Sequence, residues 1–344
     1  MQAQLLEWYV ENKRNLPWRI TKDPYHILVS EIMAQQTQIS TLLPYYTRFI
    51  EVFPTIEALA LAPIDRILKI CAGMGYYNRF HNLKKTAEII MKDFDGQIPQ
   101  EAEALQKLPG IGAYVAGAVS SIAYNKKVPA VDGNVLRVMA RLERNQDDIS
   151  KAATKKALTI HLEKTMPDCA GTFNQALMEL GALICKPQNP LCDQCPVSGF
   201  CKGQDIRHHL PVKASKKPVK EINKTILILH HPLHGILMRK RDEKLLHGLW
   251  EFYYVDKMLE EKDVATHIQK WGYTCSRLTL LGEATHLFTH LKWNMVGYTC
   301  QIEECFTIAN YIFVPAEEIR NLAMPSAFRS FIDKLSDFQP NREG

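Results

Sequence analysis

The stretch from residue 108 to residue 134 constrains this chain most, because a rigid glycine-containing turn is followed there by an isolated carboxylate. The turn, Leu108-Pro109-Gly110-Ile111-Gly112, lies between two segments of helical composition. Proline does not continue a helix, and glycine accepts positive φ, so we expect Gly110 and Gly112 to use that freedom. The second helix then begins with free backbone N–H groups directed at the turn. Such a helix start binds phosphate without the help of a side chain.

The carboxylate is Asp132, which lies in the mainly apolar run Pro129-Ala130-Val131-Asp132-Gly133-Asn134. The stretch therefore predicts a backbone grip on a phosphate and an acid held just beyond it. The alternative is an ordinary connection between two helices, followed by an unrelated aspartate. The turn alone does not separate these two interpretations.

The length and composition predict a two-domain globular protein. A chain of 344 residues is long for one domain, and 46% apolar residues suffice for a full core. No apolar run is long enough to span a membrane, and the N-terminus does not read as a signal peptide. We therefore expect a cytoplasmic, nucleoid-associated monomer with no membrane partner, in which cysteines are thiols or metal ligands rather than disulfides.

Residues 1–204 read as consecutive helices, and the charge distribution changes after them. Residues 205–224 carry 6 Lys+Arg against 2 Asp+Glu, whereas residues 225–344 carry 13 against 15. The basic, proline-containing stretch 205–224 is typical of a linker. The positive excess in the linker and in the part before it agrees with a polyanionic partner. The predicted helices are 2–13, two helices within 24–50 that meet near Pro44, 55–72 with a break at Pro63, 79–93, 101–107, 114–124, 133–144, 150–164 and 171–184.

From Thr225 the pattern predicts an α+β domain that extends to residue 344. Residues 226–238 read as a β-hairpin, in which two apolar runs flank His231-Pro232-Leu233-His234-Gly235. Further strands are expected at 250–255, 288–300 and 312–314. Helices are expected at 257–270 and 326–337.

Four closely spaced cysteines predict a metal or cluster site. Their spacing is C-x6-C-x2-C-x5-C, and structural zinc usually uses two C-x2-C pairs where this chain has one. The four are Cys185, Cys192, Cys195 and Cys201. The other cysteines are scattered and are expected to be buried small apolar residues, namely Cys71, Cys169, Cys275, Cys300 and Cys305.

A second candidate acid, Glu31, lies beside an apolar helical stripe in Ser30-Glu31-Ile32-Met33-Ala34-Gln35-Gln36-Thr37. Partial desolvation would raise the pKa of its carboxyl and suit it to general acid catalysis near neutral pH. The alternative is an exposed helical glutamate, which is what most glutamates are.

Together these motifs resemble those of the MutY-type A/G-specific adenine DNA glycosylases, and the resemblance covers nearly the whole chain. Its strongest parts are the cysteine spacing, the motif around Glu31, and Val131-Asp132-Gly133-Asn134. The resemblance implies a multidomain protein, in which an all-α helix-hairpin-helix glycosylase domain (1–204) carries a [4Fe–4S] loop. An α+β NUDIX-like domain (225–344) follows it. The implied reaction is hydrolysis of the N-glycosidic bond of adenine mispaired with 8-oxoguanine or guanine in double-stranded DNA.

The resemblance also implies roles for the two acids. Glu31 protonates the leaving adenine and then acts as a base for water, while Asp132 stabilises the oxocarbenium-like sugar. Asn134 holds the aspartate or the water. Tyr114 stands where bifunctional relatives place a lysine, and because a phenol forms no Schiff base, we expect a monofunctional enzyme that leaves an abasic site.

Further residues are assigned to substrate and DNA by the same resemblance. Trp18 and Tyr76 are also interpretable as core aromatics. The phosphohydrolase signature of NUDIX enzymes is absent, so we assign no nucleotide hydrolysis. At position 289 a threonine replaces the usual serine; its methyl group crowds the site, which leaves the strength of the expected lesion preference open but not its existence. The implied sets are Arg14, Leu16, Trp18, Arg19, Gln36, Tyr76 and Gln175 for the extruded nucleotide, Leu108, Gly110 and Gly112 for the DNA backbone, and Phe288, Thr289 and His290 for 8-oxoguanine.

Two rival functions remain at this point. One is an endonuclease III-like glycosylase/lyase for oxidised pyrimidines. Three features are evidence against it: Tyr114, Glu31 and the C-terminal domain. The other is a non-catalytic iron–sulfur DNA clamp, which would tolerate the loss of Glu31 or Asp132.

Overall fold

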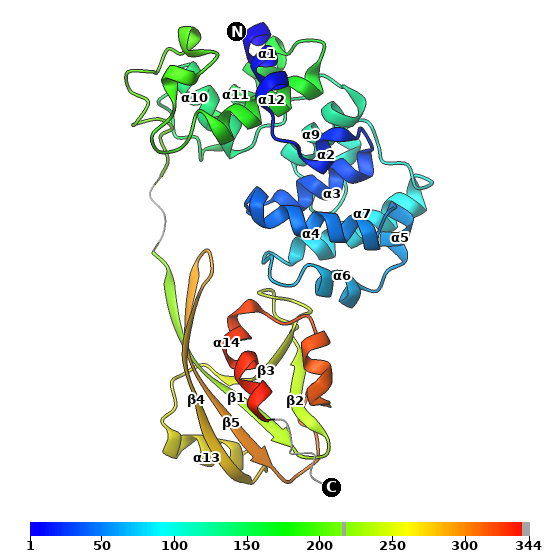
Figure 1. Cartoon of the computed structure of the whole chain (residues 1–344), viewed down its shortest axis with the longest axis vertical. Coiled ribbons are helices and arrows are strands. Elements are labelled where there is room, and N and C mark those ends of the chain that lie inside the picture. The colour runs from blue at the N-terminus through cyan, green and yellow to red at the C-terminus, as the bar shows by residue number, and fades with distance from the viewer. Residues whose placement is uncertain (215–217, 339–344) are drawn as a thin grey trace. The chain divides into compact units, whose positions relative to one another are not determined.

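The computed structural model (Figure 1) describes residues 1–214 and 218–338, so residues 215–217 of the predicted linker and residues 339–344 of the predicted last domain lie outside the described residues. The chain divides into two compact units. One comprises residues 1–62 and 79–215, and the other comprises residues 63–78 and 216–344. Each unit is described by itself.

The first unit is all-helical, as predicted. Side chains of capping residues fix the starts of two of its helices. Asp23 accepts a hydrogen bond from the N–H of Tyr25 at the start of α3, and Thr55 accepts one from the N–H of Ala58 at the start of α5. Its helices are α1 (Gln2–Asn12), α2 (Pro17–Ile20), α3 (Pro24–Ala34), α4 (Ile39–Val52), α5 (Ile56–Leu61), α7 (Asn78–Asp93), α8 (Ala102–Leu105), α9 (Ala113–Tyr124), α10 (Gly133–Leu142), α11 (Ala152–Thr165) and α12 (Ala170–Leu183).

The prediction that two helices meet near Pro44 is wrong. Pro44 lies inside α4, and the break falls at residues 35–38, where Gln36 has φ +56°. Proline removes one backbone hydrogen bond, but α4 buries Leu42, Tyr46 and Phe49 along one face. This packing holds the helix across the proline. The predicted break at Pro63 is confirmed, because α5 ends at Leu61 and α6 (Ile64–Ile70) begins after the proline.

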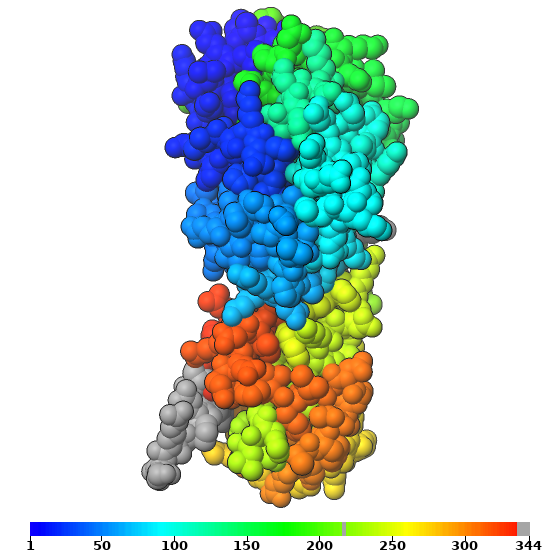
Figure 2. Space-filling view, turned by 90° about the vertical axis from the view of Figure 1, so that its right-hand side faces the viewer, coloured from blue at the N-terminus to red at the C-terminus, as the bar shows by residue number. Residues whose placement is uncertain are grey.

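The core of the first unit forms where helices approach closely at glycines. α12 packs against α1, α9 and α10, and Figures 1 and 2 both show the dark-blue N-terminal segment beside the green segment near α12. A Cβ on Gly117 of α9 would lie 2.2 Å from the carbonyl oxygen of Pro129. One on Gly181 of α12 would lie 2.7 Å from Cβ of Asn134. These contacts set the positions of α9, α10 and the loop between them.

The second unit is built on a mixed six-stranded sheet with the order β4-β5-β1-β3-β2-β6. The predicted hairpin is confirmed by the antiparallel pairing of β1 with β2, while β1 and β5 run parallel. One face of the sheet packs on Phe328 and Phe331, and the other packs on Val264 and Ile268 of α13. The strands are β1 (Lys220–His231), β2 (Gly235–Lys240), β3 (Trp250–Val255), β4 (Cys275–Leu287), β5 (Leu291–Ile302) and β6 (Ile312–Val314).

Several predicted elements of this unit differ in the structure. Strand β4 was not predicted, because it is an edge strand with little burial on either face and a bulge near Gly282. The predicted strand 288–300 is instead the turn 288–290 followed by β5. Helix α13 (Glu261–Gln269) is shorter than predicted. The predicted helix 326–337 is a four-residue helix, α14 (Arg329–Ile332), between two 3₁₀ segments.

The predicted linker also differs, because its first part packs against the first unit. The N–H of Ile149 donates to the carbonyl of Val212 at 3.0 Å, and Leu210 is buried. Strand β1 already begins at Lys220. No helix in the described ranges, 1–214 and 218–338, combines the length and apolar character needed to cross a membrane.

The expectation about the scattered cysteines is wrong for most of them. Cys275 and Cys300 are joined as a disulfide, with their Cα atoms 5.8 Å apart. Strands β4 and β5 pair antiparallel, with Cys275 opposite Ile302 and Cys300 opposite Leu278, so the disulfide joins neighbouring strands diagonally. Cys169 and Cys305 are exposed, whereas Cys71 is a buried thiol as expected.

The glycine packing predicts a large cost for one added methyl group. We expect Gly117→Ala to lower the unfolding temperature by about 4 °C or more, because the new Cβ collides with rigid backbone at Pro129. Gly133→Ala is the matched control, since a Cβ there meets no atom within 4 Å. Calorimetry in which both variants unfold alike would contradict the packing account.

Candidate active site

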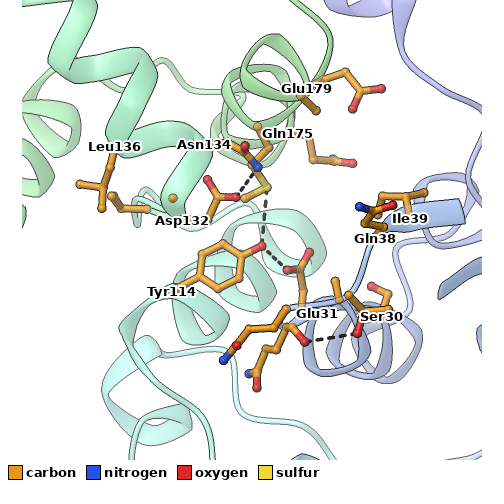
Figure 3. Close-up of a pocket in the computed structure, with 18 of the residues that line it drawn as sticks. Ser30, Glu31, Gln38, Ile39, Tyr114, Asp132, Asn134, Leu136, Gln175 and Glu179 are labelled. Carbon is orange, nitrogen blue, oxygen red and sulfur yellow. Dashed lines mark hydrogen bonds between the residues drawn. The ribbon is translucent and has the colours of Figure 1, made fainter. Parts of the chain in front are cut away.

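A cavity of about 900 Å³ lies in the first unit, lined by side chains from α2, α3, α9, α10 and α12 (Figure 3). The fold brings together in it three carboxyl groups and one phenol from distant positions in the chain, those of Glu31, Asp132, Glu179 and Tyr114. Of the predicted site residues, it is lined by Arg14, Leu16, Trp18, Arg19, Glu31, Gln36, Tyr114, Asp132, Asn134 and Gln175.

The predicted burial of Glu31 is confirmed. Its position on α3 leaves it only 8% exposed, which excludes the alternative of a solvated glutamate. The pKa of the carboxyl is raised to about 7: burial is the largest cause and the charge of Asp132 adds to it, while a hydrogen bond from Tyr114 and the charge of Arg19 oppose the rise. Glu31 is therefore about half protonated at neutral pH and is able to donate or accept a proton there.

Asp132 occupies the N-cap of α10, which explains how a lone acid is held in an apolar run. One carboxylate oxygen accepts from the N–H of Val135 at 2.7 Å, and the other accepts from Nδ2 of Asn134 at 2.8 Å. Burial raises the pKa of Asp132, whereas these hydrogen bonds and Arg137 lower it. The predicted contact between Asn134 and the aspartate is confirmed.

Asn134 is itself fixed by a buried arginine. Nη2 of Arg137 donates to Oδ1 of Asn134 at 2.9 Å and to the carbonyl of Gly181 at 2.8 Å. Nε of Arg137 donates to the carbonyl of Cys185 at 2.8 Å. Continuous hydrogen bonds therefore connect Asp132 to the first of the four closely spaced cysteines.

Tyr114 lies in the first turn of α9 and points at Glu31 (Figure 3). Its hydroxyl donates to Oε2 of Glu31, and Sδ of Met178 lies 3.9 Å away. Burial and the neighbouring carboxyls raise the pKa of the phenol well above 10, so it stays neutral near neutral pH. The group is therefore a hydrogen-bond donor with no amine or anionic chemistry.

The turn before α9 has the predicted open helix start, with one correction. Gly110 has φ +74°, and a Cβ there would lie 2.7 Å from Cβ of Asn82. Gly112 has φ −88°, so the expectation of a positive φ is wrong for it. Gly112 is the N-cap of α9, where no side chain caps the helix and a Cβ would meet nothing within 4 Å. Its lack of a side chain keeps the helix start accessible, while Leu108 is buried beneath the turn.

Sequence reasoning missed Glu179, which organises the other side of the cavity. This fully buried carboxylate of α12 accepts from Nη2 of Arg14 at 2.6 Å and from Nη1 and Nη2 of Arg19 at 2.8 and 2.7 Å. Burial opposes its ionisation, but hydrogen bonds from Arg19 and Arg14 outweigh that effect and lower the pKa of Glu179 to about 2. Both guanidinium groups, predicted as hydrogen-bond donors to a base, are thus already engaged with Glu179. The sequence did contain one signal for this role: Glu179 follows the candidate Gln175 by one helical turn, so both side chains lie on the same face of α12.

Of Trp18, Gln36 and Tyr76, which were predicted to contact the nucleotide or the duplex, only the first two line the cavity. Trp18 is buried and packs its ring edge-on against Tyr46 at 4.8 Å, so its core interpretation is confirmed. It also lines the cavity, and its contact with the nucleotide stays a prediction. Gln36 is exposed at the cavity with φ +56°. Tyr76 is 44% exposed with φ +51° and does not line the cavity, so its core interpretation is wrong, whereas Tyr77 is buried.

The three residues predicted to recognise 8-oxoguanine lie in the second unit, at the turn between β4 and β5. Phe288 is half-buried, with its ring 4.6 Å from His286 and 4.8 Å from Trp293. Thr289 and His290 are exposed at the tip. The packed ring of Phe288 thus holds the turn in place, and the polar side chains of Thr289 and His290 are presented at its tip.

All four closely spaced cysteines line one small cavity between α10, the end of α12 and the loop after it. Nη1 of Arg141 lies 3.3 Å from Sγ of Cys185. The pKa of Cys195 is raised to about 11, chiefly by burial and also by the other three thiols, against a backbone hydrogen bond from Val197. Four thiols that line one cavity fit a cationic metal group, which would compensate the charges of their thiolates.

The contacts of Glu31 predict how its proton affinity responds to Tyr114. We expect Tyr114→Phe to raise the pKa of Glu31 above about 7, because the lost hydrogen bond is one of the influences that lower it. A ¹³C NMR titration of the Glu31 carboxyl in both proteins measures the shift. Tyr124→Phe, which loses only a bond to the carbonyl of Ile98, is the control. A lower pKa in Tyr114→Phe would contradict the assignment.

Comparison with known proteins identifies three regions of the chain. Residues 29–164 match the HhH-GPD superfamily of base excision DNA repair proteins, residues 185–201 match the iron–sulfur binding domain of endonuclease III, and residues 225–334 match the NUDIX domain. Among solved structures, a thermostable thymine-DNA glycosylase superposes with a TM-score of 0.54 at 31% identity, covering 60% of this chain and 95% of that one. An endonuclease III–DNA complex, at 22% identity and a TM-score of 0.52 over 60% of this chain and 94% of that one, shows the same fold.

Whole-chain relatives narrow the assignment. The adenine DNA glycosylase of Homo sapiens is 33% identical over 88% of this chain and 67% of its own length. That of Buchnera aphidicola subsp. Baizongia pistaciae is 32% identical over 98% of this chain and 97% of its own length. These matches confirm the resemblance found in the motifs. The chain belongs to the adenine DNA glycosylase family, as a DNA-binding base excision repair enzyme with an iron–sulfur binding loop and a NUDIX-like domain.

Proposed function

We propose that this enzyme removes adenine paired with 8-oxoguanine or guanine and leaves an intact strand with an abasic site. The observation that carries the chemical part of the proposal is the pair of carboxyl groups in one cavity, Glu31 and Asp132, each in a different environment. N-glycosidic hydrolysis needs an acid for the leaving base and an anion for the sugar. The two environments divide these tasks.

Glu31 is the general acid in this mechanism. Adenine leaves poorly as an anion, so N7 must be protonated as the glycosidic bond breaks. A carboxyl with a pKa of about 7 is still substantially protonated at neutral pH, whereas an ordinary glutamate is not. After the base has left, the Glu31 carboxylate accepts a proton from the attacking water.

Asp132 is the anion beside the sugar. Its two oxygens are already held by Val135 N–H and the Asn134 amide, so little reorganisation accompanies the build-up of positive charge at C1′. Tyr114 holds the Glu31 carboxyl in place. Because Tyr114 is a phenol and not an amine, the mechanism has no Schiff base and no strand cleavage.

The extruded nucleotide has to be held from the backbone. The open start of α9, with Gly110 and Gly112, presents N–H groups to a phosphate of the DNA. The cavity then receives the base beside Trp18, Gln175 and the Arg19–Glu179 pair. Gln36 and Tyr76, both exposed with left-handed backbone, are the candidates to fill the gap in the duplex.

The iron–sulfur group fits a [4Fe–4S] cluster held by Cys185, Cys192, Cys195 and Cys201, one thiolate per iron. The four thiols line one cavity. When bound, the cluster supplies covalent cross-links that fix the loop 185–201. The loop in turn supports Arg137 and Asn134 through the carbonyl of Cys185.

Selection of the opposite base is assigned to Phe288, Thr289 and His290. The exposed hydroxyl and imidazole at the β4–β5 turn are suited to hydrogen bonds with the N7–H of 8-oxoguanine and with phosphate. Guanine lacks that N7–H, so the same contact is weaker with it. The methyl group of Thr289 crowds this contact and moderates the preference.

Labelled duplexes test the proposed function. We expect breaks at adenine opposite 8-oxoguanine, fewer opposite guanine and none opposite thymine, in each case only after hot alkali, because alkali cleaves abasic sites. Gel analysis with and without alkali gives both results. Glu31→Gln is expected to bind the duplex but release no base, while Glu57→Gln, at an exposed position of α5, serves as its control. Cleavage without alkali, or equal cleavage of all three duplexes, would contradict the proposal.

Elemental analysis tests the cluster type. We expect about four iron and four acid-labile sulfide atoms per chain, since each of four thiolates ligates one iron. Cys195→Ser is expected to lower both counts, and Cys71→Ser, a buried thiol elsewhere, is expected to leave them unchanged. One zinc atom per chain would disprove the assignment.

A further inference from the structure

We propose that Lys155 and Lys213 form a phosphate-binding site on the wall of the active-site cavity, for a backbone phosphate that flanks the extruded adenosine. Both lysines line the cavity that contains Glu31 and Asp132. They come from separate parts of the chain, and neither belongs to a motif identified in the sequence. The inference rests on the proposed extrusion of the nucleotide into this cavity.

Lys213 is held at the cavity by its neighbours on both sides. The carbonyl of Val212 accepts from the N–H of Ile149 at 3.0 Å, and the N–H of Ala214 donates to the carboxylate of Asp148. Asp148 also accepts from N and Oγ of Ser150, at 2.8 and 2.6 Å. Segments 148–150 and 212–214 are thus joined into one piece of wall.

Lys155 extends the same wall from α11. It lies in the first turns of that helix, and Ile149 and Ser150, which precede the helix, line the cavity as well. Both lysine side chains are exposed, so they reach a ligand at the cavity mouth without disturbing the core. The two cations therefore face the same space from adjoining segments.

The charges of the cavity show what these lysines have to bind. Arg14 and Arg19 are paired with Glu179. Within residues 1–214 and 218–338, by contrast, Lys155 and Lys213 form no ion pair and no side-chain hydrogen bond. Two uncompensated positive charges at a cavity mouth attract an anion.

The anion that necessarily accompanies an extruded adenosine is one of its own phosphodiesters. The base and sugar are neutral until the bond breaks, and Glu31 and Asp132 repel other anions from the depth of the cavity. Extrusion costs a few kcal/mol of stacking and pairing, which contacts to the flanking backbone offset. Lysine, as a compact charge on a flexible stem, suits a phosphate without requiring fixed geometry.

A charge-neutralisation cycle tests the contact. The DNA is an A:G duplex with 2′-fluoro-2′-deoxyadenosine, whose glycosidic bond resists cleavage, with or without a neutral methylphosphonate 5′ or 3′ to that nucleotide. Fluorescence anisotropy measures Kd for wild type, Lys155→Ala, Lys213→Ala and the double variant. Lys156→Ala is the matched control, because this exposed neighbour on α11 does not line the cavity.

We expect each lysine variant to weaken binding about three- to tenfold, and the slope of log K against log salt to fall by about 0.9 per lysine. At one of the two positions the methylphosphonate should weaken wild type and Lys156→Ala, but not the double variant further. If the methylphosphonate weakens the double variant as much as wild type at both positions, the proposal is wrong. An unchanged salt slope would also refute it.

Failure of this inference is distinguishable from failure of the proposed function. Wild type is assayed in parallel for adenine release from the unmodified A:G duplex. Absence of release there contradicts the proposed function. Release with additive effects in the cycle contradicts only the role of the lysines.

Discussion

The buried guanidinium of Arg137 is the interaction on which the rest of the first unit depends. A buried cation is destabilising unless its donors are satisfied, and Arg137 satisfies them with Asn134, Gly181 and the carbonyl of Cys185. The same bonds orient Asn134 toward Asp132 and tie α10 to the cysteine loop. Gly181 allows this because no side chain separates α12 from Asn134. The geometry of the active site and the position of the cysteine loop therefore depend on the same hydrogen bonds of Arg137.

Three carboxyl groups near this network, two buried and that of Asp132 half-buried, behave differently because their hydrogen bonds differ. Glu31 has a single strong donor and a neighbouring acid, so burial dominates and its pKa rises to about 7. Asp132 has backbone and amide donors that partly compensate burial. Glu179 has two arginines, which hold its pKa at about 2. One cavity thus contains a proton donor, a held anion and a permanently charged anchor. The permanent anchor leaves the proton chemistry to Glu31 and Asp132.

The sequence predicted best where a pattern is local. Helical periodicity located most helices of the first unit, and the apolar stripe beside Glu31 indicated its burial. Prediction failed where packing overruled a local signal: α4 continues through Pro44, because Leu42, Tyr46 and Phe49 bury its face. Edge strand β4 was missed because neither of its faces is well buried. Gly112 was expected to need positive φ, but the structure uses its missing side chain instead.

The sequence by itself determined most helices of the first unit, four thiols at cluster spacing, and two acids within recognisable motifs, because each of these is encoded in neighbouring residues. The tertiary structure decided which groups meet. Glu179 joins Arg14 and Arg19 across more than 150 positions, and Cys275 and Cys300 meet because strands β4 and β5 pair antiparallel. Lys155 and Lys213 reach one cavity wall only because segments 148–150 and 212–214 are hydrogen-bonded. Such contacts depend on how helices and strands pack, and packing energy is not readable from any single stretch of chain.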